Sequence, residues 1–211
     1  MRIILDVQHA GKPSNPGDRG TGADQDRDGK IEIHEQEAEL TPIIVHGASI
    51  AAADYEGVHV HVLTRGEYAD RQRQANEICK KTQEPTAYFA LHLNSASTLP
   101  SPPYALVGFD ARSKGSEALA RCLADAWGKA GYVAPVRIEG TTPTSAQSWQ
   151  RNVNYTIAGV YAGPSLISGV CCELAFIQDT KGAGTAGLLA QGAAIVNAAM
   201  CWLGTYHKGG A

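Results

Sequence analysis

The chain has 211 residues, of which 44% are hydrophobic and 18% are charged. This length suits one hydrophobic core better than two, and the composition lies far from that of disordered chains. The formal net charge is −3 and the pI is near 6.1, so the chain has no broad basic field. We therefore expect one folded domain over residues 1–206, and we expect neither nucleic acid nor an anionic membrane as a partner.

Five short apolar or alternating runs, bounded by Gly, Pro, Asn and Ser, predict strands. They cover residues 3–7, 58–63, 87–93, 105–109 and 169–174. Helical periodicity follows at residues 43–53, 69–81, 116–130 and 186–203. Strands that alternate with helices predict an α/β fold, with a twisted, mainly parallel or mixed sheet flanked by helices on both faces.

The two ends of the chain give separate predictions about targeting, membrane insertion and flexibility. The apolar run near the N-terminus is too short for a signal peptide, so we expect synthesis in the cytoplasm without one. The stretch 186–203 is interrupted by Gln191 and Asn197, which favours an amphipathic helix and argues against membrane insertion. Residues 207–211 are expected to form a flexible tail, and we expect the protein to be a monomer.

Three polar residues stand where predicted strands end. His9 follows the first strand, His92 lies at the end of the third, and Glu173 lies near the end of the fifth. Ligands of open α/β sheets bind outside the carboxyl ends of the strands. Two imidazoles and carboxylates that converge there would provide the ligands of a catalytic zinc, although a single histidine is more often structural.

Four segments, in order along nearly the whole chain, strengthen this interpretation. They are Ile4–Gly11, Leu63–Arg65 with Arg71 and Ala75–Asn76 following, Ala90–Ala96, and Cys172–Ile177. Together they resemble the motifs of the amidase_3 type of zinc-dependent N-acetylmuramoyl-L-alanine amidases, which cut peptidoglycan between the glycan lactyl group and the stem peptide. Gln8 and Ala10 stand where that family usually has glycines, so the local backbone is expected to differ.

The resemblance implies a zinc ion with three protein ligands. His9 and His92 match two of them, and a glutamate near the start of the first long helix would be the third. Glu37 fits the Glu-x-x-Leu-Thr pattern of the family best, with Glu35 and Glu39 as alternatives.

The same resemblance makes Glu173 the catalytic carboxylate, which takes a proton from water and delivers it to the leaving nitrogen. Asn94 is expected to orient His92 or to steady the substrate. Pro42 belongs in the first turn of a helix, which suggests Thr41 as the N-cap.

The segment between His9 and Glu37 is roughly a dozen residues longer than the resembled family usually has, and it contains a second motif. Residues 24–35 match the twelve-residue calcium loop, with acids at positions 1, 3 and 5, glycine at 6, an apolar residue at 8 and glutamate at 12. A solvated acidic loop is the alternative. The candidate calcium ligands are Asp24, Asp26, Asp28, Lys30 and Glu35.

The three tryptophans, Trp127, Trp149 and Trp202, are expected in the core, with a place in a groove as the alternative for Trp149. The chain is thus expected to be a peptidoglycan amidase that uses zinc and also binds calcium. A phage or prophage endolysin that acts on the cell wall after release is the expected context. A zinc peptidase that cuts within the stem peptide, or a calcium-dependent wall-binding module without catalysis, are the alternatives.

Overall fold

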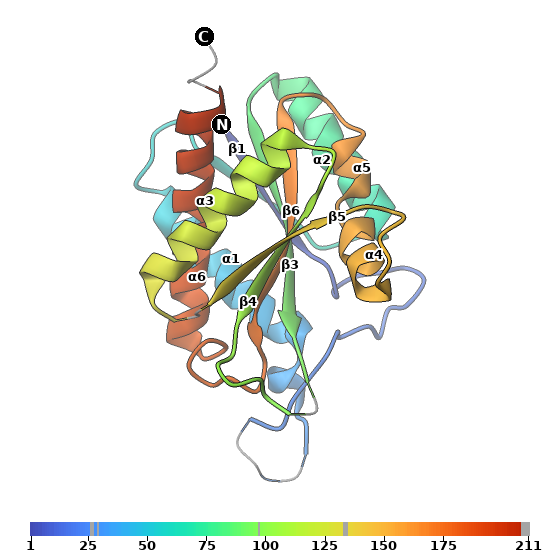
Figure 1. Ribbon diagram of the computed structural model, residues 1–211, viewed down its shortest axis with the longest axis vertical. Coiled ribbons are helices and arrows are strands. Elements are labelled where there is room, and N and C mark those ends of the chain that lie inside the picture. The colour runs from blue at the N-terminus through green and yellow to red at the C-terminus, as the bar shows by residue number, and fades with distance from the viewer. Residues whose placement is uncertain (26–27, 29, 97, 133–134, 208–211) are drawn as a thin grey trace.

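The structure is a computed structural model that describes residues 1–25, 28, 30–96, 98–132 and 135–207 (Figure 1). The strands are β1 (Arg2–Val7), β2 (His59–Leu63), β3 (Thr86–Asn94), β4 (Ala105–Asp110), β5 (Val136–Thr141) and β6 (Ile167–Phe176). The helices are α1 (Glu37–Ala52), α2 (Tyr68–Thr82), α3 (Lys114–Ala130), α4 (Ser148–Tyr155), α5 (Ala158–Tyr161) and α6 (Thr185–Trp202). A 3-10 turn covers Ile33–Glu35, and a π turn covers Leu203–His207.

The described strands form one six-stranded sheet in the order β2-β1-β3-β6-β4-β5. Strands β2, β1, β3 and β6 are mutually parallel, whereas β4 runs antiparallel to β6 and parallel to β5. The described residues between β3 and β4 contain no helix, and the chain reverses direction there, since β4 runs opposite to β3. The sheet is therefore mixed, and β4 and β5 begin at the edge where β1, β3 and β6 end.

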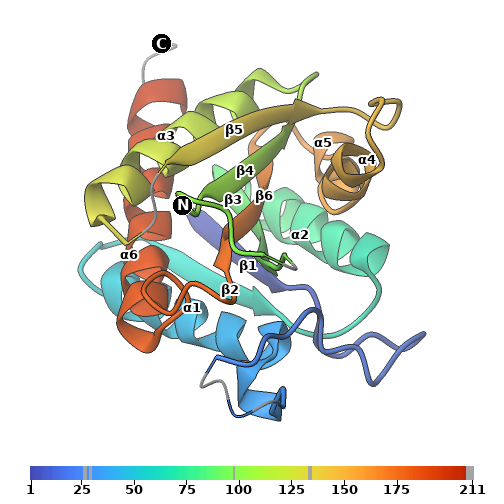
Figure 2. The ribbon, with the colours of Figure 1, turned by 60° about the horizontal axis from the view of Figure 1, so that its bottom comes forward.

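Helices cover both faces of the sheet, as the sequence predicted (Figures 1 and 2). Alternate residues of the strands point to opposite faces. Ile3 and Leu5 of β1 enter the larger core, which α1, α3 and α6 cover. Ile4 enters the smaller core, beneath α2, α4 and α5. Residues of β1, β3 and β6 that share the orientation of Ile4 face the side on which the candidate site lies.

The five predicted strands and four predicted helices are present with shifted ends, but three elements were missed. Strand β5 lies at the sheet edge and most of its residues are only half-buried or exposed. Helices α4 and α5 have eight and four residues, which is too short for helical periodicity to be recognised.

Helix α1 begins earlier than the sequence suggested. Its N-cap is Gln36, and Pro42 is the sixth helical residue, so Thr41 is not the N-cap. The backbone N–H groups of Glu37 and Ala38 donate to carbonyls of the preceding loop, which adds a full turn before the proline. The Thr41 hydroxyl instead donates to the carbonyl of Glu37 at 2.9 Å.

Helix α6 and the turn after it, Thr185–His207, are long and apolar enough to cross a membrane by length and composition, and 56% of the 18-residue apolar stretch within them is buried inside the molecule. Its backbone lies close to α1, because a Cβ on Gly192 would come within 2.1 Å of the Ile44 carbonyl oxygen. Beyond it, the His207 ring packs edge-on against Trp202, with centroids 4.5 Å apart. Residues 208–211 of the predicted tail lie outside the described part of the chain.

Candidate active site

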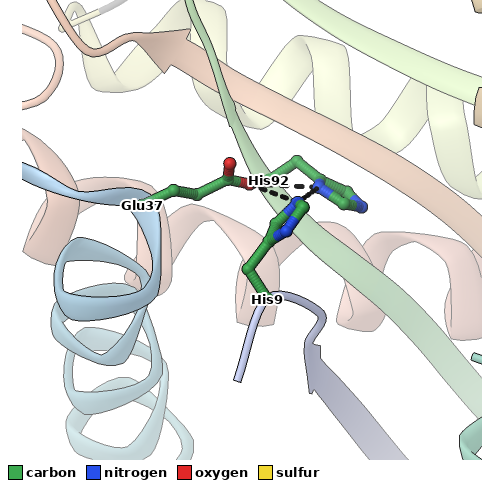
Figure 3. A group of neighbouring side chains, drawn as sticks. All are labelled: His9, Glu37 and His92. Atoms are coloured by element: carbon green, nitrogen blue, oxygen red, sulfur yellow. Dashed lines mark hydrogen bonds and ion pairs between the residues drawn. The ribbon is translucent and has the colours of Figure 1, made fainter. Parts of the chain in front are cut away.

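Three side chains from separate elements converge at one edge of the sheet (Figure 3). His9 follows β1, Glu37 is the first residue of α1, and His92 lies near the end of β3. His9 Nε2 lies 3.1 Å from His92 Nδ1 and 3.4 Å from Glu37 Oε1, and the latter two atoms are 3.0 Å apart. The fold thus brings together the three residues that the sequence proposed as zinc ligands, with one donor atom of each facing the other two.

The spacing of these atoms fits a tetrahedral zinc site. Ligand atoms about 2.0–2.1 Å from a zinc ion, at tetrahedral angles, lie about 3.3–3.4 Å apart. The three observed separations, 3.0 to 3.4 Å, are close to this edge length. Two nitrogens and one carboxylate oxygen would leave the fourth position for water or substrate, as in catalytic zinc sites.

The outer nitrogen of each ring has its own partner. His9 Nδ1 lies 3.1 Å from Asp18 Oδ1, and His92 Nε2 lies 2.9 Å from Gln8 Oε1. Because both partners are acceptors, they favour a proton on each outer nitrogen, and a neutral ring would then aim the lone pair of its inner nitrogen at the shared centre. Hydrogen bonds of this kind orient histidine ligands in metalloproteins and fix their tautomers. Neither partner was identified from the sequence as a site residue, because Asp18 lies in an irregular loop and Gln8 stands where the resembled motif has a glycine.

Gln8 belongs to a buried network of polar side chains. Its side-chain amide donates to Asp6 Oδ2 at 2.7 Å, and Tyr88 donates its hydroxyl proton to the same carboxylate. Arg71 donates to Asp6 Oδ1 at 2.9 Å and to the Val7 carbonyl at 2.5 Å. Asp6, Gln8, Arg71 and Tyr88 are all fully buried. A satisfied network of this kind is rigid, so it fixes the orientation of His92 through Gln8.

Glu37 is held by backbone groups on two sides. Its Oε1 accepts from the Leu93 N–H at 2.9 Å, and its Oε2 accepts from the Thr21 N–H at 3.2 Å. The loop can lie this close only because residue 20 is glycine: it has φ +71°, and a Cβ there would come within 2.4 Å of Glu37 Oε2 and 2.8 Å of His9 Cγ.

Burial and charge act differently on the two histidines. Burial lowers the pKa of His9 more than Glu37 and Asp18 raise it. Burial also opposes the cation of His92, but its hydrogen bond to Glu37 and the charges of Glu37 and Glu173 raise its pKa overall. The carboxylates of Glu37 and Glu173 thus favour positive charge beside them, and a divalent cation would satisfy the same carboxylates.

Glu173 lies beside this cluster on the neighbouring strand. It is paired in register with His92, and both side chains line a cavity of about 720 Å³. Burial, supported by the charge of Glu37 and opposed by that of His92, raises the pKa of Glu173. A carboxyl with a raised pKa is suited to accept and return a proton near neutral pH.

The cavity is lined by side chains from the carboxyl ends of β3 and β6, from the beginnings of β4 and β5, and from helix α4. Trp149, which is 43% exposed, is one of them, so the groove position is correct for this tryptophan and the core position is wrong. Trp127 and Trp202 are fully buried, as expected. The lining residues are His9, Tyr68, His92, Asn94, Tyr104, Leu106, Arg137, Glu139, Trp149, Asn152, Val153, Tyr155, Thr156, Cys171 and Glu173.

The other candidate residues lie outside the cluster. Glu39 forms an exposed ion pair with Arg19, and the Glu35 carboxylate accepts from the backbone N–H groups of Gln25 and Glu32. Asn94 lines the cavity, but its Oδ1 accepts from the Ser95 N–H. The bond that orients His92 comes from Gln8 instead.

The calcium-like loop is only partly described. Asp26 lies outside the described residues. Asp24 Oδ1 accepts from the Asp28 N–H at 3.1 Å, and Asp28 Oδ1 accepts from the Lys30 N–H at 2.9 Å. These hydrogen bonds, like those of the Glu35 carboxylate, fold the loop on its own backbone.

The fold is similar to that of known peptidoglycan amidases. The N-acetylmuramoyl-L-alanine amidase from Clostridium difficile 630 matches with a TM-score of 0.67 and 15% identity, over 97% of each chain. The amidase AmiC2 of Nostoc punctiforme gives 0.62 and 15%, over 98% of this chain and 97% of that one. The catalytic domain of the CD27L endolysin targeting Clostridia difficile gives 0.57 and 14%, over 93% and 96%.

No family model and no curated protein matched the sequence. At these identities the likeness establishes the fold, a single domain with a mixed sheet flanked by helices, which this chain shares with N-acetylmuramoyl-L-alanine amidases.

Proposed function

We propose that the protein is a zinc-dependent N-acetylmuramoyl-L-alanine amidase that hydrolyses the amide between the glycan lactyl group and the L-alanine of the stem peptide. The observation that carries this proposal is the cluster of His9 Nε2, Glu37 Oε1 and His92 Nδ1, with Glu173 beside it in one cavity. The shared fold with peptidoglycan amidases supports the same substrate class.

The chemistry follows from the placement of these groups. His9, Glu37 and His92 would hold the zinc, which polarises a carbonyl and lowers the pKa of water when it is bound. Glu173 accepts a proton from the attacking water as the oxygen adds to the amide carbon. It then delivers this proton to the alanine nitrogen as the C–N bond breaks, and it returns to the carboxylate form. The products are a glycan lactyl carboxylate and a peptide with a free amino terminus.

We also propose the biological context that the sequence suggested. The enzyme would be made in the cytoplasm, act as a monomer, and reach the wall on release as a phage or prophage endolysin. One of the proteins with the same fold is the catalytic domain of an endolysin, which supports this context.

The test combines metal analysis with product analysis. Purified protein is expected to contain one zinc per chain, to lyse cell walls, and to lose both after chelation. Walls digested by the parent should release intact peptides with alanine at the new amino terminus. Glu37→Gln is expected to lose zinc. Glu39→Gln, which changes an exposed glutamate of the same helix, is its matched control and should keep zinc.

Each alternative predicts a different result. Cleavage inside the stem peptide, with alanine still attached to the glycan, would make the protein a zinc peptidase. Wall binding that depends on calcium, with no hydrolysis at any zinc concentration, would make it a binding module and contradict the proposal.

A further inference from the structure

The cavity extends well beyond the candidate metal centre. His92 on β3 pairs with Glu173 on β6, Glu173 pairs with Leu106 on β4, and Leu106 pairs with Arg137 on β5. Residues paired in register point to the same face of a sheet, so these four form one row across four neighbouring strands. All four line the cavity, and Arg137 is the exposed member of the row.

The row sets a length scale for the substrate. Three strand spacings of about 4.8 Å separate His92 from Arg137 along the sheet, which gives roughly 14 Å between their backbones. An extended peptide advances about 3.3–3.6 Å per residue. Because an arginine side chain is long, it can reach back along this row. A group carried about two to four residues from the cleaved bond would therefore lie within its reach.

Arg137 is held in place without being neutralised. Its guanidinium lies 3.7 Å from the centroid of the Tyr104 ring, and Tyr104 in turn packs edge-on against Phe176, with centroids 5.0 Å apart. No described acidic side chain forms an ion pair with Arg137. The nearby cavity residue Glu139 instead accepts a hydrogen bond from Gln150 at 2.6 Å. Of the described residues that line the cavity, Arg137 is the one with a permanent positive charge.

The order of the groups along the row assigns a direction to the substrate. The candidate metal ligands His9 and His92 lie on the β1 and β3 side, where the amide carbonyl would be polarised. Glu173, which protonates the leaving nitrogen, comes next toward β4. The peptide attached to that nitrogen would therefore continue over Leu106 toward Arg137 within the same cavity.

We propose that Arg137, supported by the ring of Tyr104, is a specificity residue that binds a carboxylate of the peptide leaving group. This inference rests on the proposed amidase function and adds the substrate class: an acidic peptide, with its carboxylate about two to four residues from the cut. The planar guanidinium forms two parallel hydrogen bonds with a carboxylate. A neutral sugar stacked on Tyr104 and Trp149 is the competing occupant, and it would be insensitive to the charge of the peptide.

Direct binding tests this without relying on turnover. Two synthetic tripeptides that begin with L-alanine would be compared, one with free carboxylates at its second and third residues and one with carboxamides there. The parent protein is expected to bind the acid form about 10- to 100-fold more tightly, and high salt should reduce the difference. Arg137→Gln should remove the preference, and Arg137→Lys should retain part of it. Arg121→Gln, which changes an exposed arginine of α3, should keep the preference whole.

A second variant separates the contribution of the Tyr104 ring from that of the Arg137 charge. Tyr104→Leu keeps Arg137 but removes the ring beneath it, so the preference for the acid should shrink without disappearing. Circular dichroism would confirm that each variant is folded. Equal binding of the two peptides by the parent, undetectable binding of both, or an undiminished preference in Arg137→Gln would overturn the proposal.

Wall digestion distinguishes this failure from failure of the function. A parent that releases peptides from walls but binds both tripeptides equally would leave the amidase standing and refute the role of Arg137. A parent that prefers the acid peptide through Arg137 but never cleaves the lactyl amide would refute the amidase and retain the peptide site.

Discussion

Two groups of potential metal ligands occur in this protein, and they are built in opposite ways. The candidate calcium ligands are contiguous, all within residues 24–35. The candidate zinc ligands come from three elements that are 28 to 83 residues apart in the sequence, as the positions of His9, Glu37 and His92 show. The contiguous group matches a complete sequence motif, yet its described carboxylates accept from the loop's own backbone N–H groups. The dispersed group lacks a contiguous motif, yet its donor atoms face one another.

The difference shows what makes a site ready to bind metal. The candidate zinc ligands have their outer atoms held by Asp18, Gln8 and the Thr21 N–H, so little conformational entropy remains to be lost on binding. The carboxylates of Asp24, Asp28 and Glu35, in the described part of the loop, do not gather around one centre, so the loop would have to rearrange to surround an ion. We therefore expect large effects from changes at the dispersed site and small ones from changes in the loop.

Removal of a candidate zinc ligand should have the largest effect. His9→Ala and His92→Ala are each expected to weaken zinc binding by more than about 100-fold and to abolish wall lysis, since loss of an outer-shell partner alone costs about 10- to 100-fold. Glu37→Gln should also lose zinc, whereas Glu39→Gln should not. Zinc content and affinity, measured on folded variants, would check this. Full zinc binding in both histidine variants would remove the assignment.

The next effect is expected on turnover alone. Glu173→Gln preserves the shape of the side chain but removes the carboxylate, so the rate should fall by about 10²- to 10⁴-fold while zinc is retained. Glu139→Gln changes the other glutamate of the cavity and is expected to leave the rate within the same order of magnitude. Initial rates of peptide release, at equal zinc content, are the measurement. If Glu173→Gln lost zinc, the residue would be a ligand and not the proton carrier.

Gln8 tests whether the buried network supports the metal centre. Gln8→Met keeps the length of the side chain but removes both its bond to His92 and its bond to Asp6. Zinc affinity should fall by about 10- to 100-fold, as for other partners of histidine ligands. Isothermal titration with zinc would measure the change. An unchanged affinity, in a variant with unchanged thermal stability, would show that His92 is oriented without Gln8.

The loop should give the smallest effect, confined to stability. We propose that calcium binds residues 24–35, where the acidic side chains repel one another until a divalent ion neutralises them. At a hundredfold excess over its Kd, calcium would stabilise the fold by about 2.7 kcal/mol, which corresponds to a Tm increase of roughly 5–10 °C. The Asp24→Asn, Asp28→Asn double variant should lose this increase, while Asp54→Asn should keep it. A calcium response of equal size in all three proteins would leave a solvated acidic loop as the better description.

The sequence predicted most of the regular structure because hydrophobic periodicity reports burial, and the long elements are strongly periodic. Strands β1, β3 and β6 and helices α2, α3 and α6 were predicted within a few residues of their observed ends. The start of α1 was placed too late, because hydrogen bonds from a distant loop, and not the local cap chemistry around Pro42, decide where this helix begins. The half-exposed edge strand β5 and the short helices α4 and α5 gave no periodic signal.

By itself, the sequence determined the fold class and named His9, Glu37, His92 and Glu173, because the chain order of strand ends and motif residues is a property of the sequence. It did not determine which acceptor orients each histidine, and it gave no reason to connect Arg137 with the site. Those features depend on the register of neighbouring strands and on a loop that folds back over α1. Only the tertiary structure decides them, because they join residues that are distant in the chain, where local propensity carries no information.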